Sequence, residues 1–258
     1  MPAEMGIGAQ LRALKRLGMI TGGSAVLLGA WELHSPWMAG ERAEARFIEA
    51  YRKRFAELLL SSFSAEVLSD IAPRQERRSR LLVANHRAIL DIPILLDRFG
   101  GTLLSKAEVA EWPLAGRMAT RARTIFVDRD DQSSGVRAIR TMRGALEQGL
   151  TLSVFPEGTV YSGDEIQEFR AGAFLAAKGL DVEILPVGLA YPEEVEWGGR
   201  DLRDHLSALL GRGRTPVALS IGEPFAADAR GALLAKEARE RVQAQVLDAR
   251  ERLSAAQR

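Results

Sequence analysis

The N-terminal quarter of the chain carries apolar side chains at helical spacing. Within residues 40–62 they recur every three or four positions while charged side chains occupy the other face, a pattern that predicts an amphipathic helix. The apolar positions are Ala43, Phe47, Ile48, Tyr51, Phe55, Leu58 and Leu59. Because Ser35-Pro36 and Gly40 indicate a turn just before them, we expect residues 8–62 to form a helical hairpin.

From Leu81 onward the pattern changes to short, nearly continuous apolar runs separated by helical stretches. The expected strands are 80–84, 101–105, 123–127, 151–155, 183–189 and 216–221, and the expected helices are 89–98, 113–121, 133–148, 168–179 and 229–254. This alternation predicts an α/β domain with a mixed, largely parallel central sheet covered by helices. We therefore divide the chain into a helical hairpin, residues 1–65, and an α/β domain, residues 66–258.

Two local details of the α/β part are also predicted. Ser133-Ser134 is expected to cap the helix that follows, and Gly149 is expected to end it. The stretch 191–214 is rich in Gly, Glu and Arg and lacks a clear period, so we expect an irregular surface excursion there.

The first expected helix contains an apolar segment from Leu17 to Trp31, preceded by three basic residues between positions 12 and 16. At about fifteen residues, it is shorter than the roughly twenty needed to cross a hydrocarbon core. A secretory signal peptide and a buried helix of a soluble core are both compatible with this pattern. We favour a third interpretation, a monotopic anchor whose apolar face dips into one leaflet, with Trp31 and Trp37 at the headgroup level.

Composition narrows the classes of function. The 258 residues are 47% hydrophobic, enough for a sizeable core, and the formal charge of +1 gives no sign of a nucleic-acid partner. The chain has no cysteine, which excludes a cysteine nucleophile, disulfides and thiolate metal sites, and agrees with a reducing cytosol without proving one. The histidines, His34, His86 and His205, are scattered, so no metal site is expected.

A histidine and a carboxylate, His86 and Asp91, directly follow the apolar run 81–84. Histidine suits a general base because its unperturbed pKa is about 6.5, and a carboxylate on its other ring nitrogen would fix the tautomer. Five residues on one helix differ by about 140°, so the pair requires His86 in the turn after the strand and Asp91 in the first helical turn. The spacing alone is weak evidence: His86 could instead bond a backbone carbonyl, and Asp91 could stabilise the helix N-terminus.

A second polar segment, Phe155-Pro156-Glu157-Gly158-Thr159, ends another expected strand, where open α/β sheets place their ligands. Glycine lets a substrate approach the backbone, while Glu157 and Thr159 can hydrogen-bond a polyol or a headgroup. A plain turn is the alternative. Lys106, Arg129 and Arg170 also stand near strand ends or turns, and they would form an anion site if they converge; otherwise they are surface cations.

Together these segments resemble the glycerolipid acyltransferases, whose bacterial type is the lysophosphatidic acid acyltransferase. The likeness rests on four ordered blocks: Asn85-His86-x-x-x-x-Asp91, Thr124 to Arg129, Phe155 to Thr159 with Phe169-Arg170-Ala171-Gly172-Ala173 after it, and Ile184-Leu185-Pro186-Val187. It covers roughly residues 80–190. Four blocks in order are far more specific than any one of them.

The resemblance implies a glycerol-3-phosphate acyltransferase-like fold with an N-terminal two-helix membrane-binding element. It implies that His86 is the general base and Asp91 its orienter, and that Arg129, Glu157, Gly158 and, more weakly, Lys106 bind the acyl acceptor. The acyl donor would be acyl-coenzyme A or acyl-carrier protein, and no metal or cofactor would be needed. The expected partners are a lysolipid, lysophosphatidic acid first, and the bilayer surface at the cytoplasmic face of the inner membrane.

Two departures from the family pattern leave alternatives open. Arg87 stands where the family usually has Gln or another small or polar residue, and Val160 stands where an arginine is common. Loss of that arginine removes one phosphate ligand, so a lyso-aminolipid or another hydroxylated lipid is an alternative acceptor. A thioesterase using the same pair with water, and a lipid-binding protein with a decayed site, are the other hypotheses. No Gly-x-Ser-x-Gly segment supports a serine hydrolase.

Overall fold

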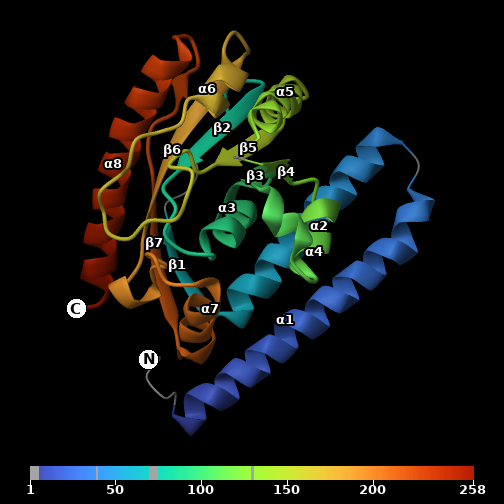
Figure 1. Ribbon diagram of the computed structural model, residues 1–258, viewed down its shortest axis with the longest axis vertical. Coiled ribbons are helices and arrows are strands. Elements are labelled where there is room, and N and C mark those ends of the chain that lie inside the picture. The colour runs from blue at the N-terminus through green and yellow to red at the C-terminus, as the bar shows by residue number, and fades with distance from the viewer. Residues whose placement is uncertain (1–5, 39, 70–74, 129–130) are drawn as a thin grey trace.

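The computed structural model describes residues 6–38, 40–69, 75–128 and 131–258, and its centre is one mixed sheet (Figure 1). The strands are β1 Ala65–Ser69, β2 Ser79–Ala84, β3 Thr102–Lys106, β4 Ile125–Val127, β5 Thr151–Val154, β6 Val182–Ala190, β7 Thr215–Ile221 and β8 Phe225–Ala226. They lie in the order β1-β7-β6-β2-β5-β3-β4, with β8 also paired to β6. The two pairs β6–β7 and β6–β8 are antiparallel, and the other described pairs are parallel.

Helices cover both faces of this sheet. They are α1 Ile7–His34, α2 Glu41–Ser62, α3 Asp91–Phe99, α4 Ala115–Arg121, α5 Gln132–Glu147, α6 Gly172–Ala177, α7 Leu202–Gly211 and α8 Gly231–Ala256. Three short 3-10 helices are η1 Ser35–Trp37, η2 Ala107–Glu111 and η3 Glu193–Val195. The predicted α/β class, with its largely parallel sheet, is thus confirmed.

The apolar strands divide their side chains between two cores. On β2, Leu81 and Val83 pack with residues of α5, α6 and α8, whereas Leu82 and Ala84 pack with residues of α3 and α7. Successive side chains of a strand point to opposite faces, so a strand covered on both sides must be apolar throughout. This is why β2 and β6 are buried along their whole length.

Helix α8 runs along β6 so closely that one position must be glycine (Figure 1). A Cβ at Gly188 would overlap with the backbone of Gln245 and Val246 in α8. Backbone atoms cannot move aside as a flexible side chain can, so a larger residue there would push the helix off the sheet.

The predicted N-terminal helical hairpin is present as α1 and α2, which lie side by side along the edge of the domain (Figure 1). Arg16 ties α1 to the α/β part: its buried guanidinium donates to the carbonyls of Leu209, Leu210 and Gly213 and to the Ser64 hydroxyl. None of the described helices is both long and apolar enough to span a bilayer. The division of the chain at residue 65 stays a prediction.

The structure corrects two local predictions and adds two strands. The stretch 191–214 is not an irregular excursion, because it contains α7, whose N-terminus is capped by the Asp201 carboxylate accepting from the Asp204 N–H. Helix α5 is capped by Asp131, which accepts from the Ser133 N–H, rather than by the serines themselves. Strands β1 and β8 were not predicted, since they are short edge strands with half-buried side chains.

Candidate active site

Four parallel strands, β2, β5, β3 and β4, end at the same edge of the sheet. The two polar segments predicted to form the site begin just beyond these ends. His86 lies two residues after β2, and Glu157 lies three residues after β5. Lys106 is the last residue of β3. The carboxyl edge of the sheet therefore gathers residues that are far apart in the sequence, as open α/β folds do.

His86 and Asp91 are in direct contact, with 2.7 Å between Nδ1 of the ring and Oδ2 of the carboxylate. The ring stacks on Phe155 at a centroid distance of 4.2 Å and is 15% exposed. No described residue hydrogen-bonds to Nε2. The arrangement matches the required one, with His86 in the turn after β2 and Asp91 as the first residue of α3. Among the described residues Nε2 thus has no hydrogen-bond partner, and a neutral imidazole nitrogen in this state can accept a proton.

The Asp91 carboxylate is fully buried and is held by four donors. Oδ2 accepts from the His86 ring and from the backbone N–H groups of Arg87 (2.7 Å) and Ala88 (2.9 Å). Oδ1 accepts from the Tyr191 hydroxyl at 2.6 Å. Since both oxygens are occupied, the carboxylate has one orientation, and the ring nitrogen bound to it is fixed as well.

Asn85, the residue before the histidine, bonds this turn to the neighbouring strand of the sheet, β6. The buried side-chain amide of Asn85 donates to the carbonyl of Leu189 and accepts from its N–H, both at 2.8 Å. The amide thereby acts as an extra rung between the end of β2 and β6. Its role was not predicted, because a lone asparagine after a strand has no distinctive spacing.

Glu157 forms a buried ion pair with Arg87, the residue that departs from the family pattern. The distance from Arg87 Nη1 to Glu157 Oε1 is 2.8 Å, and neither side chain is more than 1% exposed. Glu157 also accepts from the backbone N–H groups of His86 and Gln167, both at 3.0 Å. Glu157 thus positions the protein's own backbone, a role the sequence did not predict, and its contact with an acceptor stays a prediction.

The same guanidinium of Arg87 also holds the long loop that follows β5. It donates to the carbonyls of Gly163 (2.7 Å) and Glu165 (2.9 Å). From α8, Arg250 pairs with the Asp164 carboxylate at 2.7 Å, and Gln243 hydrogen-bonds the same loop. The loop is thus fixed on two sides, against the histidine and against α8.

Gly158 and Arg170 lie together at the turn of this loop. Gly158 has φ +83°, a conformation that favours glycine, and a Cβ there would lie 2.5 Å from Arg170 Nε. Arg170, Thr159 and Lys106 are exposed, and neither cation forms an ion pair with a described residue. Arg129, the remaining predicted acceptor ligand, lies outside the described residues.

A second histidine, His205, lies beneath the turn that carries His86, and the sequence did not predict a role for it. His205 of α7 is fully buried, stacks on Trp197 at 4.9 Å, and accepts from the Ile89 N–H through Nε2 at 3.3 Å. Burial, together with the nearby Arg200, lowers the pKa of His205 to about 4, so the ring is neutral near pH 7. Only the tertiary contact with residues 86–91 could have identified it.

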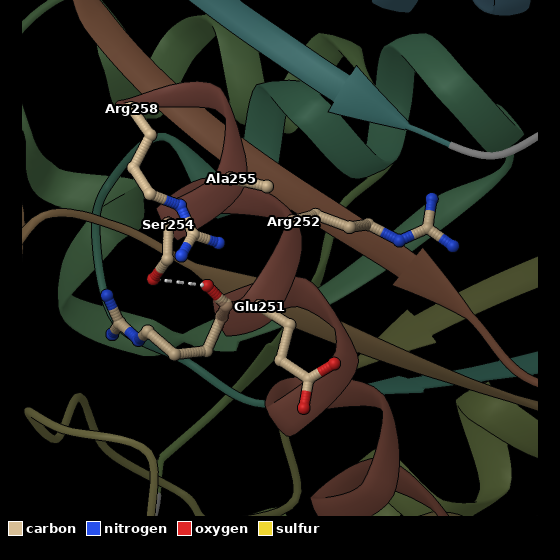
Figure 2. A pocket seen from close by; sticks show the side chains of 6 residues that line it. Glu251, Arg252, Ser254, Ala255 and Arg258 are labelled. Atoms are coloured by element: carbon tan, nitrogen blue, oxygen red, sulfur yellow. Dashed lines mark hydrogen bonds between the residues drawn. The ribbon is translucent and has the colours of Figure 1, made fainter.

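A hollow in the described part of the surface lies away from the histidine, at the C-terminal end of α8, and has a volume of about 510 Å³. Figure 2 shows the side chains that line it: Arg250, Glu251, Arg252, Ser254, Ala255 and Arg258. The Ser254 hydroxyl there donates to the carbonyl of Arg250, one turn earlier on the same helix, at 2.9 Å. Among the described residues, no cluster of three or more His, Asp or Glu side chains could hold a metal ion.

Known proteins are similar to this chain in sequence. The Acyltransferase family model matches residues 68–190. A lyso-ornithine lipid O-acyltransferase of Pseudomonas aeruginosa is 33% identical over 230 residues, which cover 84% of this chain and 86% of that protein. A 1-acyl-sn-glycerol-3-phosphate acyltransferase of Neisseria meningitidis is 31% identical over 114 residues, 44% of this chain and 45% of that protein.

A solved structure supports the same assignment at the level of the fold. The crystal structure of the 1-acyl-sn-glycerophosphate acyltransferase from Thermotoga maritima superposes with a TM-score of 0.68 at 21% identity, covering 93% of this chain and 97% of that one. The resemblance found in the sequence is therefore confirmed: the chain belongs to the Acyltransferase family and is an acyltransferase.

Proposed function

We propose that this acyltransferase moves a fatty acyl chain from acyl-coenzyme A or acyl-carrier protein to the free hydroxyl of a lysolipid, with His86 as the general base. The observation that carries the proposal is the 2.7 Å contact of His86 Nδ1 with the buried Asp91 carboxylate. No residue that the structure describes hydrogen-bonds to Nε2 of the same ring. Such a pair does the same work in other acyl-transfer enzymes, where a carboxylate steadies the imidazolium.

The chemistry follows from the free ring nitrogen. Nε2 takes the proton of the lipid hydroxyl as its oxygen attacks the thioester carbonyl. The new C–O bond forms, the C–S bond breaks, and the proton passes from the imidazolium to the leaving thiolate. Because the attacking oxygen belongs to the acceptor, no nucleophile of the protein is needed, and Asp91 serves to orient the ring.

The acceptor headgroup is assigned to the exposed polar groups at the carboxyl edge of the sheet. Lys106 is the last residue of β3, and the segment 155–159 directly follows β5, the strand paired with β3. Arg170 lies against Gly158 in the same turn. With Thr159 and Arg129, these cations would bind an anionic headgroup oxygen, a carboxylate or a phosphate.

Among lysolipids, we favour a lyso-ornithine lipid over lysophosphatidic acid. The Pseudomonas aeruginosa relative, which matches most of both chains, carries that name. Val160 occupies the place where an arginine is common in the family, so one phosphate ligand is missing. An ornithine headgroup presents a carboxylate and an ammonium, and it needs fewer cations than a phosphate does.

Helix α1 is the membrane-binding element in this proposal. It exposes the large apolar side chains of Ile7, Leu11, Leu14, Leu17, Val26 and Leu33, which spread over about half of its circumference, and Trp37 follows in η1. A helix with such a face lies in the bilayer interface rather than across it. Since acyl-coenzyme A and acyl-carrier protein are cytoplasmic donors, the protein would bind the cytoplasmic face of the membrane.

The test is an acceptor panel. Purified protein is incubated with labelled acyl-coenzyme A or acyl-carrier protein and with lyso-ornithine lipid, lysophosphatidic acid or lysophosphatidylethanolamine, and mass spectrometry identifies the product. We expect acylated ornithine lipid from the wild type and from the control His34→Ala, and none from His86→Ala. Release of free fatty acid without any acceptor would identify a thioesterase instead, and acylation of lysophosphatidic acid alone would overturn the acceptor assignment.

A further inference from the structure

Tyr191 contacts Asp91 from the opposite side to the histidine. It directly follows β6, is fully buried, and donates its hydroxyl proton to Asp91 Oδ1 at 2.6 Å. The His86 ring uses the other carboxylate oxygen. The three side chains thus form a continuous row, His86–Asp91–Tyr191, in which the carboxylate is the middle member.

The tyrosine is itself held in place by two independent contacts. Its backbone carbonyl accepts from Arg250 Nη1 at 2.5 Å, and Arg250 also pairs with Glu196 at 3.0 Å. Two residues earlier, Leu189 is bonded twice by the Asn85 amide. The backbone that carries the ring is therefore fixed by contacts from the turn after β2 and from α8.

The charges around the row make the phenol a permanent donor. Burial, and then the Asp91 carboxylate beside it, raise the pKa of Tyr191 well above its ordinary value, so the proton stays on the oxygen. The other titratable groups close by are the Arg87–Glu157 pair, Glu196 and His205. None of these groups donates to Asp91 Oδ1. Among the described residues, that oxygen accepts from the Tyr191 hydroxyl alone.

We infer that Tyr191 is a positioning residue for acyl transfer, one that holds the Asp91 carboxylate and limits the negative charge it offers to His86. The inference rests on the proposed role of His86 as base. A donated hydrogen bond at Oδ1 draws charge away from Oδ2, so the carboxylate fixes the ring without overstabilising the imidazolium. The imidazolium can then return its proton to the leaving thiolate.

Tyr191→Phe removes a single oxygen and keeps the ring. Because Tyr191 is fully buried and touches no substrate, we expect KM for both substrates to stay the same. We expect kcat to fall roughly tenfold, part of the 10²–10⁴-fold that a positioned general base supplies. Loss of the donor leaves more charge on Asp91 and favours the imidazolium, so the deficit in kcat/KM should grow toward low pH.

Tyr51→Phe is the matched control. Tyr51 is also buried, and its hydroxyl donates to Met118 Sδ at 2.7 Å, within the packing of α1, α2 and α4 rather than at the carboxyl edge of the sheet. Its loss should leave kcat and the pH profile as in the wild type. An unchanged kcat and pH profile in Tyr191→Phe would overturn the inference, as would a loss confined to KM.

A readout without substrate separates this inference from the proposed function. The chain has three histidines, so the ring signal of His86 can be assigned by its disappearance in His86→Ala. In Tyr191→Phe its NMR titration should move to higher pH. Should the wild type acylate none of the lysolipids, the proposed function fails while this titration still tests the hydrogen-bonded row.

A second measurement does not depend on the folding of the Phe variant. In protein labelled with 3-fluorotyrosine, the phenol is more acidic and a stronger donor to Asp91. The titration of the His86 ring should then move to lower pH, opposite to the effect of removing the hydroxyl. Movement in the same direction in both proteins, or in neither, contradicts the inference.

Discussion

Arg87 and Glu157 form an ion pair behind the histidine, with 2.8 Å between Nη1 and Oε1 and both side chains almost completely buried. The pair connects the two sequence blocks of the site, because Glu157 also accepts from the His86 N–H and Arg87 also donates to the loop after β5. The position of His86 relative to that loop therefore depends on two buried charges that neutralise each other.

Removal of one member of this pair should be costly. We expect Arg87→Met to lower the free energy of unfolding by about 3–5 kcal/mol, because it leaves the Glu157 carboxylate buried without a partner. The double variant Arg87→Met, Glu157→Leu should lose less than the sum of the two single variants in urea unfolding. Arg54→Met, which breaks the exposed pair Arg54–Glu57, is the control and should cost less than about 1 kcal/mol. Additive losses would show that the pair is not coupled.

Asp91→Asn should inactivate the enzyme while its fold persists. The amide that replaces the carboxylate is neutral and has one accepting oxygen instead of two, so it cannot accept from the His86 ring, two backbone N–H groups and the Tyr191 hydroxyl together. It also offers no negative charge to steady an imidazolium, so the pair loses both its orientation and its electrostatic support. We expect kcat for acyl transfer to fall on the order of 10³–10⁴-fold. Asp97→Asn, on the same helix but paired only with Arg98 at 3.6 Å among the described residues, should remain active. Full activity of the Asp91 variant would remove the basis of the mechanism.

His205 should make the protein sensitive to acid. The unfolded chain binds this proton near pH 6.5, whereas burial lowers the pKa in the folded state to about 4. Above pH 6.5 His205 is neutral in both states and costs no stability. As the pH falls toward 4, the unfolded state binds the proton and the folded state does not, so the free energy of unfolding decreases by up to about 3 kcal/mol. When the pH is lowered from 7.5 to 4.5, the free energy of unfolding should decrease in both proteins. The decrease should be roughly 2–3 kcal/mol smaller for His205→Gln than for the wild type. The exposed variant His34→Gln should behave as the wild type, and equal losses in all three proteins would exclude the effect.

The apolar face of α1 should control binding to membranes. Leu11 and Leu14 are exposed on this helix, so changing both to Glu should leave the fold intact and weaken sedimentation with anionic phospholipid vesicles by at least roughly tenfold. The double variant Leu233→Glu, Leu247→Glu makes an equal change in charge on α8, where both side chains are also exposed. Its vesicle binding should match that of the wild type. A similar decrease in both variants would point to charge repulsion without a defined membrane face.

Much of the fold could be predicted because the strands at its centre are buried on both sides. That burial requires continuous apolar runs, and all six strands expected from such runs are present. Strand β1 and helix α7 were missed for the opposite reason. The alternating exposure of β1 is carried by only five residues, and α7 is a ten-residue helix inside a stretch dominated by Gly and Arg.

The sequence alone determined the family and the α/β class, and it predicted the contact between His86 and Asp91. It could do so because a strand followed by a turn and a helix has local signals that do not depend on tertiary contacts. Only the tertiary structure decided what surrounds that pair. Tyr191, His205 and the Arg87–Glu157 ion pair act across 70 to 116 residues of chain. Such contacts depend on which strands become neighbours and how deeply each charge is buried, and no spacing in the sequence encodes either.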